Sequence, residues 1–219
     1  MLRLKDETFG YGGTTVLSGV DFTLSPGERV VLLGRSGAGK STLLNAVHAR
    51  LVQRFPEVAL VPQEHGLVPQ LSVFHNVYMG RLDRHGALYN LANLAMPFAR
   101  ERRAMAEILE TVGLAGLEGK AVASLSGGQK QRTALARAMH RGGPILIGDE
   151  PVSAVDERHA EALVATLCSR FDTMLLALHD VALARGFASR LVGIRGGRIL
   201  FDGPAAEITD EAIHDLYRA

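Results

Sequence analysis

Short, almost continuous apolar runs alternate along the chain with longer stretches in which apolar residues recur at helical spacing. The clearest run covers Arg29 to Leu33, and others cover 58–61, 145–149, 173–178 and 191–194. Such runs are typical of strands buried on both faces of a parallel sheet. Their alternation with helices favours an α/β fold over a helical bundle or a sandwich. We therefore expect an α/β core with a parallel sheet.

Glycine and proline clusters mark turns near both ends of the chain. The glycines between positions 10 and 13 and the pair Pro26-Gly27 predict short, hairpin-connected strands in the N-terminal segment. Towards the C-terminus, the run IRGGRILFDG predicts two strands joined through Gly196-Gly197.

Residues 64–141 carry no strand-like run and are expected to form a helical region inserted between two strands of the sheet. Ser72 is a suitable N-cap for a helix that includes Val73 and Val77. Residues 100–112 have apolar positions at helical spacing, and residues 134–140 continue a helix that opens at Gly127-Gly128.

Composition narrows the class of protein. Of 219 residues, 47% are hydrophobic and 21% are charged, which excludes a disordered chain and a disulfide scaffold. Cys168 is the single cysteine; we expect a reducing compartment and a small core residue at this position. With 24 basic and 23 acidic residues, the net charge of +1 gives no general reason to bind nucleic acid. No run approaches the ~18 apolar residues of a membrane span, so we expect a soluble, cytoplasmic chain.

The run GRSGAGKS at positions 34–41 matches the phosphate-loop pattern in full, between a predicted strand and a predicted helix. In such a loop the backbone N–H groups surround phosphate oxygens, and the helix start adds positive potential. Lys40 can reach the terminal phosphates, and the Ser41 hydroxyl can bind Mg²⁺. The alternative is a glycine-rich turn without a ligand, which the complete motif disfavours. The expected nucleotide-binding residues are Gly34, Arg35, Ser36, Gly37, Ala38, Gly39, Lys40, Ser41 and Thr42.

A second apolar run, ILIGDE, ends in two carboxylates, Asp149 and Glu150. At the C-terminal edge of a parallel sheet, Asp149 can hold Mg²⁺, and Glu150 can orient the attacking water or accept its proton. The alternative is a helix-capping pair before Pro151. The phosphate loop in the same chain favours the catalytic interpretation.

The run LSGGQKQR supplies another anion site, because Ser126 and two glycines stand at a predicted helix start. A single phosphate loop does not require a second such site in the same chain.

Together, the phosphate loop, the LSGGQKQR run and the DEP motif resemble the nucleotide-binding subunit of an ATP-binding cassette (ABC) transporter, over nearly the whole chain. The resemblance implies a P-loop NTPase core with ATP and Mg²⁺ as cofactors. It implies that Tyr11 stacks on adenine and that Gln63 contacts Mg²⁺ and the attacking water. It also implies that His179 lies near the γ-phosphate and that Asp156 lies in a dimer-interface loop. The signature residues that would contact the partner subunit's ATP are Ser126, Gly127, Gly128 and Gln129.

The resemblance also implies partners. Two chains would form a head-to-tail homodimer on ATP binding, and a separate transmembrane permease would hold the dimer at the inner face of the membrane. A substrate-binding protein would be added if the system imports, and no nucleic acid is expected. The runs GLVPQLSVFHNVYMGRL and DEPVSAVD are similar to importer subunits for phosphonates and related phosphorus oxyanions.

The sequence departs from the family pattern between Lys40 and Gln63, which are only 23 positions apart (63 − 40). We therefore expect a small, reduced antiparallel β-subdomain from which one hairpin is missing. The chain is expected to form one domain, with the core in 1–63 and 142–219 and the helical subdomain and signature motif in 64–141. No regulatory extension is expected after the C-terminal hairpin.

Three other functions are compatible with some of these motifs. A soluble ABC protein that acts on ribosomes or chromosomes usually has two cassettes or long coiled coils, and this chain has one cassette and no heptads. A regulatory module that holds ATP without hydrolysing it would not need Glu150, Gln63 and His179. A kinase with the same loop would have no use for LSGGQ.

Overall fold

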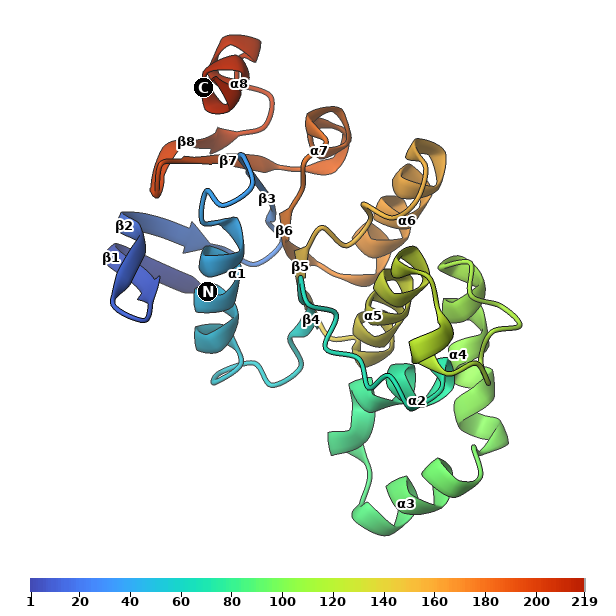
Figure 1. Ribbon diagram of the computed structural model, residues 1–219. Coiled ribbons are helices and arrows are strands. Elements are labelled where there is room, and N and C mark those ends of the chain that lie inside the picture. Colours follow the sequence, from blue (N-terminus) through green and yellow to red (C-terminus); the bar gives the residue numbers. More distant parts are fainter. Residues whose placement is uncertain (219) are drawn as a thin grey trace.

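The computed structural model describes residues 1–218, which form two sheets and the helices around them (Figure 1). The six-stranded sheet has the order β4-β5-β6-β3-β7-β8, in which only β8 is antiparallel to its neighbour. A separate two-stranded antiparallel sheet pairs β1 with β2. The strands are β1 (Leu2–Tyr11), β2 (Thr14–Leu24), β3 (Arg29–Leu33), β4 (Ala59–Val61), β5 (Ile145–Asp149), β6 (Thr173–Ala177), β7 (Arg190–Arg195) and β8 (Arg198–Pro204).

Eight α-helices and two short 3₁₀ segments complete the described residues. Among them, no helix is both long enough and apolar enough to cross a membrane. The α-helices are α1 (Lys40–Leu51), α2 (Val73–Tyr78), α3 (Ala87–Ala95), α4 (Ala99–Thr111), α5 (Gly127–Arg141), α6 (Glu157–Arg170), α7 (Val181–Phe187) and α8 (Asp210–Tyr217), and the 3₁₀ segments are η1 (Met79–Arg84) and η2 (Val122–Ser124).

The core has two layers because the strands are buried on both faces. In β3, Val30 and Leu32 face α1 and the β1–β2 sheet, whereas Val31 and Leu33 face the helices on the other side. This alternation follows from the two-residue repeat of a strand. It explains why the core strands are continuous apolar runs, as expected. Cys168 on α6 is half-buried against the second layer, at the edge of the core rather than inside it.

The N-terminal hairpin is longer than the glycine pattern predicts. β1 and β2 span 10 and 11 residues, so the prediction of short strands is wrong. Their pairing register shifts at three places, and Asp6 and Gly19 adopt positive φ angles of 48° and 60°. Such bulges bend a strand without ending its ladder of hydrogen bonds.

The chain runs from the end of α1 to β4 through residues 52–58 without an intervening strand. Within the described residues, the antiparallel sheet is therefore limited to β1 and β2, which confirms the predicted loss of a hairpin. The helices α2 to α5 lie between β4 and β5 in the chain, as expected, and extend away from the sheet (Figure 1). Ser72 caps α2 by accepting a hydrogen bond from the His75 N–H.

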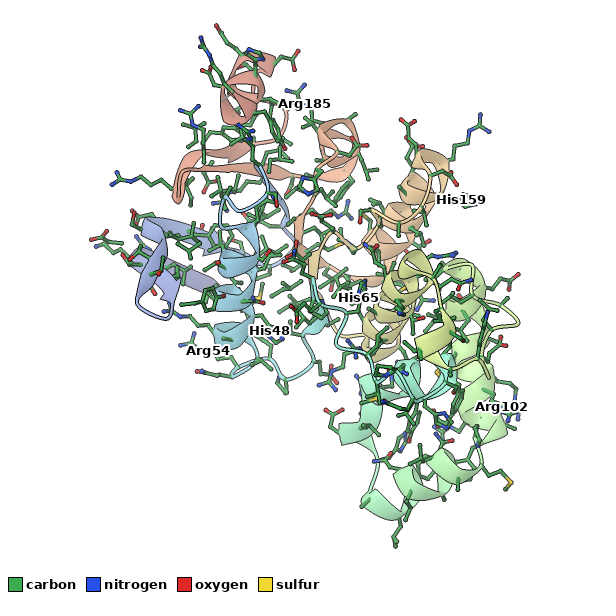
Figure 2. All side chains as sticks on the ribbon, viewed as in Figure 1. His48, Arg54, His65, Arg102, His159 and Arg185 are labelled. Carbon is green, nitrogen blue, oxygen red and sulfur yellow. The ribbon has the colours of Figure 1, made fainter. Side chains whose placement is uncertain are left out.

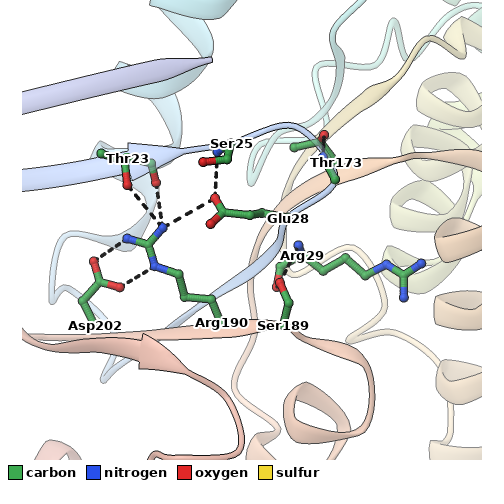
Figure 3. Close-up of polar contacts among 9 residues, drawn as sticks. Thr23, Ser25, Glu28, Arg29, Thr173, Ser189, Arg190 and Asp202 are labelled. Carbon is green, nitrogen blue, oxygen red and sulfur yellow. Dashed lines mark hydrogen bonds and ion pairs between the residues drawn. The ribbon is translucent and has the colours of Figure 1, made fainter.

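One arginine joins the two sheets (Figure 3). The Arg190 guanidinium on β7 donates to both carboxylate oxygens of Asp202 at 2.5 and 2.6 Å and to the Thr23 carbonyl of β2 at 3.0 Å. It also pairs with Glu28 at 3.5 Å and lies over the Phe22 ring. Its side chain is only 17% exposed, so these contacts are poorly screened by water.

We expect Arg190→Ala to lower the free energy of unfolding by about 2–3 kcal/mol, because it leaves two partly buried carboxylates without their partner. Denaturant unfolding measures this loss. Arg198→Ala, at an exposed position of β8, is the matched control and should change stability by less than ~0.5 kcal/mol. Equal losses in the two variants would contradict the assigned role of Arg190.

A buried histidine makes stability depend on pH. His140 on α5 is 1% exposed, and neither ring nitrogen has a hydrogen-bond partner among residues 1–218. Burial, with smaller contributions from Arg81, Arg84 and His85, lowers the pKa of His140 from 6.5 to about 4. The folded protein therefore holds this imidazole neutral at a pH where the unfolded chain binds a proton.

Because the unfolded state takes up the extra proton, the free energy of unfolding should fall as the pH drops from about 6.5 to about 4. The full loss is roughly 3 kcal/mol for a shift of this size. Denaturant unfolding at several pH values measures the slope. His140→Leu should flatten the curve in that window, and a curve that keeps its slope would exclude His140 as the source.

Candidate functional site

The loop between β3 and α1 requires glycine at two positions where other backbone atoms or side chains come close. Gly34 has a φ of 147°, and a Cβ there would lie 2.3 Å from the Ile194 carbonyl oxygen. Gly39 has a φ of 110°, and its Cβ would lie 2.5 Å from the Leu17 side chain. Gly39 is also the N-cap of α1 and offers no side chain to cap it. The first N–H groups of α1 are thus available to an anion.

Lys40 is held inside this loop by the loop's own backbone. Its ammonium donates to the carbonyl oxygens of Gly34 at 2.7 Å and Arg35 at 3.1 Å. An ammonium has three N–H donors, so one remains for a ligand. Burial lowers the pKa of Lys40, while the carboxylates of Glu150 and Asp149 act in the opposite direction. The lysine therefore presents a positioned positive charge beside the start of α1.

A cavity of about 350 Å³ brings together most of the predicted site residues. They come from the phosphate loop, from the segment after β4, from the end of β5 and from the segment after β6, whose strands are parallel neighbours in the sheet. Parallel strands place their carboxyl ends at one edge, where ligands of such sheets bind. The lining residues are Val16, Ser36, Gly37, Gly39, Lys40, Ser41, Thr42, Gln63, Asp149, Glu150 and His179.

Three side chains in this cavity form an oxygen-rich group suited to Mg²⁺. The Ser41 hydroxyl donates to Gln63 Oε1 at 3.3 Å, and the Asp149 carboxylate lies in the same cavity and is 8% exposed. Hydroxyl, amide and carboxylate oxygens are the ligands that Mg²⁺ prefers, usually with several waters retained. The residues present therefore fit the metal that the sequence implies.

Glu150 follows β5 in a strained conformation. Its φ is 52°, one of two positive values among the described residues other than glycine. Such a backbone costs about 1–3 kcal/mol and persists only where neighbours hold it. The Glu150 N–H donates to the Ala177 carbonyl at 3.0 Å, and its side chain is paired with His179 Nε2. The strain therefore places a carboxylate and an imidazole in contact at the mouth of the phosphate loop.

Gln131 is a supporting residue that the sequence analysis did not single out. Its side-chain amide donates to the Glu150 carbonyl and, at 2.8 Å, to the Ser153 hydroxyl. Gln131 lies on α5 within the LSGGQKQR run, which is visible in the sequence. The sequence does not show that the Gln131 side chain points towards Glu150. Val16, which lines the cavity from β2, was also missed, since one valine in a strand gives no signal.

The predicted second anion site lies at the start of α5 and does not line the phosphate-loop cavity. Ser126 and Gln129 form a capping box: the serine hydroxyl accepts from the Gln129 N–H, and Gln129 Oε1 accepts from the Ser126 N–H at 3.0 Å. The box leaves the N–H groups of Gly127 and Gly128 unused by side chains. A Cβ on Gly128 would lie 3.4 Å from Ala154, so the signature turn contacts the segment before α6.

Asp156 and Tyr11 lie at exposed positions outside the cavity. Asp156 is the N-cap of α6, where it accepts from the His159 N–H and pairs with the His159 ring at 2.5 Å. His159 itself lies on α6 (Figure 2). Tyr11 ends β1 at the tip of the hairpin and is 60% exposed. The structure thus groups the phosphate-loop residues in the cavity and leaves both of these side chains at the surface, with the Asp156 carboxylate bonded within its own helix.

Arg137 joins the signature helix to the loop after Gln63. Its guanidinium donates to the carbonyl oxygens of Gly66 at 2.7 Å and His65 at 2.6 Å. His65 lies between the core and the helical region (Figure 2). Burial lowers the pKa of Arg137, which nevertheless stays charged at neutral pH. A residue of α5 is thereby fixed to a loop that begins in the phosphate site.

Comparison with known proteins places these features in a family. Residues 17–153, more than half of the chain, match the family described as ABC transporter. The chain belongs to this ABC transporter family. Its ABC cassette is also similar in structure to MJ0796, a bacterial ABC transporter cassette solved as a dimer: the TM-score is 0.79 and identity is 26%, over 94% of this chain and 99% of that one.

Two named relatives of this ABC protein act in import. The phosphonates import ATP-binding protein of Rhizobium etli is 33% identical, over 99% of this chain and 86% of that protein. The hypophosphite import ATP-binding protein of Stutzerimonas stutzeri is 37% identical, over 99% of this chain and 71% of that protein. The chain is accordingly an ATP-binding and ATP-hydrolysing subunit of an ABC transporter, as its sequence motifs indicate.

Proposed function

We propose that this ABC ATPase drives import of a phosphonate or a related phosphorus oxyanion, and that two copies close head to tail around two ATP molecules. The observation that supports the head-to-tail dimer is that the two predicted anion sites of one chain are separate. The phosphate loop and the Ser126 turn do not line one cavity, and both have helix N–H groups to offer. A two-fold dimer lets each copy's turn meet its partner's ATP, using each patch twice.

Within each site, hydrolysis needs charge stabilisation and a positioned water rather than covalent catalysis. Lys40 and the N–H groups of α1 would bind the terminal phosphates. Glu150 would accept a proton from the attacking water, and His179 would contact the γ-phosphate. The contact between these two side chains supports joint action at the same group.

Mg²⁺ would be held by Ser41, Gln63 and Asp149. When bound, it would neutralise charge on the phosphate oxygens. The hydrogen bond between Ser41 and Gln63 supports this assignment, because it shows that the two oxygens reach the same space.

Tyr11 and Asp156, both exposed and outside the cavity, would contact the adenine and the partner chain. Tyr11 would stack on adenine, a contact that in nucleic-acid complexes is worth about 1–3 kcal/mol per base. Asp156 would lie across the dimer interface, in the segment that contacts the signature turn through Ala154. Their exposure supports both roles, because neither side chain is used in the core.

Transport requires a membrane partner. We place the dimer on a transmembrane permease at the inner face of the membrane, where the helical region 64–141 would contact the permease. A substrate-binding protein would lie on the opposite face of the membrane. The names of the two relatives support the import direction and the cargo class.

Uptake by the native host tests the proposed cargo. Cells that carry Glu150→Gln in this chain should lose most uptake of labelled methylphosphonate, while uptake of an amino acid stays unchanged. Unchanged uptake of methylphosphonate, hypophosphite and phosphite, with loss of another solute, would overturn the cargo class but not the ATPase assignment.

A further inference from the structure

Helix α3 has its apolar side facing outward. Leu88, Leu91 and Leu94 are 85%, 65% and 47% exposed, and Met96, directly after the helix, is 71% exposed. These four are half of the exposed large hydrophobic residues of the described chain. They stand within nine positions of one another, and α3 lies at the extremity of the helical region farthest from the six-stranded sheet (Figure 1). We call Leu88, Leu91, Leu94 and Met96 the α3 face.

The polar residues of the same helix point inward and are hydrogen-bonded. Asn93 is fully buried: its Oδ1 accepts from the Phe98 N–H at 2.8 Å, and its Nδ2 has no hydrogen-bond partner among the described residues. Asn90 accepts from the Tyr78 hydroxyl at 2.6 Å and donates to two backbone carbonyls. Tyr89 donates to the buried Glu101 carboxylate at 2.9 Å.

These bonds determine which side of α3 faces out. A surface helix of a water-soluble domain normally buries its apolar stripe and exposes its polar side, and α3 does the reverse. Rotating the helix to bury the leucines would break the hydrogen bonds of Asn90 and Asn93 and leave polar groups unpaired. The exposed leucines are therefore held outward by the fold and are suited to an apolar environment.

The charged residues in and after the α3 segment indicate which kind of apolar environment the α3 face meets. Positions 86–99 contain no charged residue. Directly after them come Arg100, Arg102 and Arg103, which are exposed and form no ion pair with any described residue. Glu101 between them is buried and bonded to Tyr89. Arg102 lies on the outer side of the helical region (Figure 2). An exposed leucine face that is followed in the chain by unpaired arginines has the chemistry that binds an anionic phospholipid surface.

We propose that the α3 face inserts into the surface of an anionic phospholipid bilayer, with Arg100, Arg102 and Arg103 bound to lipid phosphates. This contact would give the cassette its own attachment to the membrane, in addition to the permease. It rests on exposure, hydrogen bonding and charge in the helical region, and it does not depend on the cargo or on the ATP site.

Co-sedimentation of the full chain with vesicles tests this contact. Vesicles of phosphatidylglycerol and phosphatidylethanolamine should bind the protein, and vesicles of phosphatidylcholine should bind it much more weakly. Replacing Leu88, Leu91 and Met96 together by Ser should lower the partition coefficient at least about tenfold. Replacing the three arginines by Gln should lower it roughly a hundredfold, since each is worth about fivefold near an anionic surface.

Leu200→Ser is the matched control, because Leu200 is 44% exposed on β8 and should not affect vesicle binding. ATP turnover in solution should match wild type in every variant, which separates this test from that of the ATPase site. The proposal is wrong if wild-type protein does not bind anionic vesicles or if the serine variant binds them equally well. It is also wrong if that variant loses only self-association or only co-purification with the permease, because the α3 face would then bind protein.

Discussion

Glu150→Gln should reduce ATP turnover about a thousandfold while ATP binding persists. The change removes the proposed proton acceptor from the mouth of the phosphate loop but keeps the size and polarity of the side chain. It leaves Lys40 and the N–H groups of α1, which would bind the phosphates, unaltered. Because hydrolysis would reopen the dimer, the variant should accumulate as an ATP-bound dimer. Phosphate release gives the rate, and size-exclusion chromatography with ATP gives the assembly state.

Glu157→Gln is the matched control, since it makes the same change at an exposed position in the first turn of α6. It should turn over ATP at the wild-type rate and return to the monomer once the ATP is consumed. Undiminished turnover in Glu150→Gln would exclude Glu150 as the proton acceptor. A slow enzyme that never dimerises would instead contradict the link between hydrolysis and opening.

Ser126→Arg should abolish the rise of specific activity with protein concentration. In wild-type protein, the rate per subunit should climb with concentration, because each site of the proposed dimer needs the turn of a second chain. Arginine at the exposed N-cap of α5 blocks that approach and removes the hydroxyl of the capping box. Binding of ATP to the variant's own phosphate loop should persist. Turnover measured over a hundredfold range of protein concentration, beside equilibrium ATP binding, separates the two effects.

Ser169→Arg introduces the same charge near the end of α6, at an exposed position remote in sequence from both anion sites. Its activity should follow the wild-type concentration curve. A specific activity that is flat with concentration in wild type, and equal in Ser126→Arg, would mean that each chain hydrolyses ATP alone. The head-to-tail dimer would then have to be abandoned.

Local patterns predict the fold and most of the phosphate site because each depends on neighbours in the chain. The strand before Gly34 is encoded in a run of five residues and the helix after Gly39 in a run of twelve, and the two glycines are required by close contacts with the Ile194 backbone and the Leu17 side chain. The missing hairpin was likewise visible, because a segment of seven residues between α1 and β4 cannot hold two strands.

Other features depend on contacts between distant parts of the chain. The positive φ of Glu150 is held by Ala177 and Gln131, neither of which marks its partner in the sequence. The α3 segment is amphipathic, but its periodicity does not say which side faces the protein; the hydrogen bonds of Asn90 and Asn93 decide that. The length of β1 and β2 depends on bulges at Asp6 and Gly19, and only one of these is a glycine.

The Arg137 contact has a consequence for how the two ATP molecules are used. In the proposed dimer, the loop after Gln63 belongs to a chain's own ATP, whereas α5 begins at the turn that meets the partner's ATP. The Arg137 guanidinium on α5 holds two carbonyls of that loop. A movement of α5 should therefore displace the loop, and a movement of the loop should displace α5. Linkage makes such coupling reciprocal for the two binding equilibria. The two nucleotides should therefore bind cooperatively, with a Hill coefficient above one that falls towards one when Arg137 is replaced.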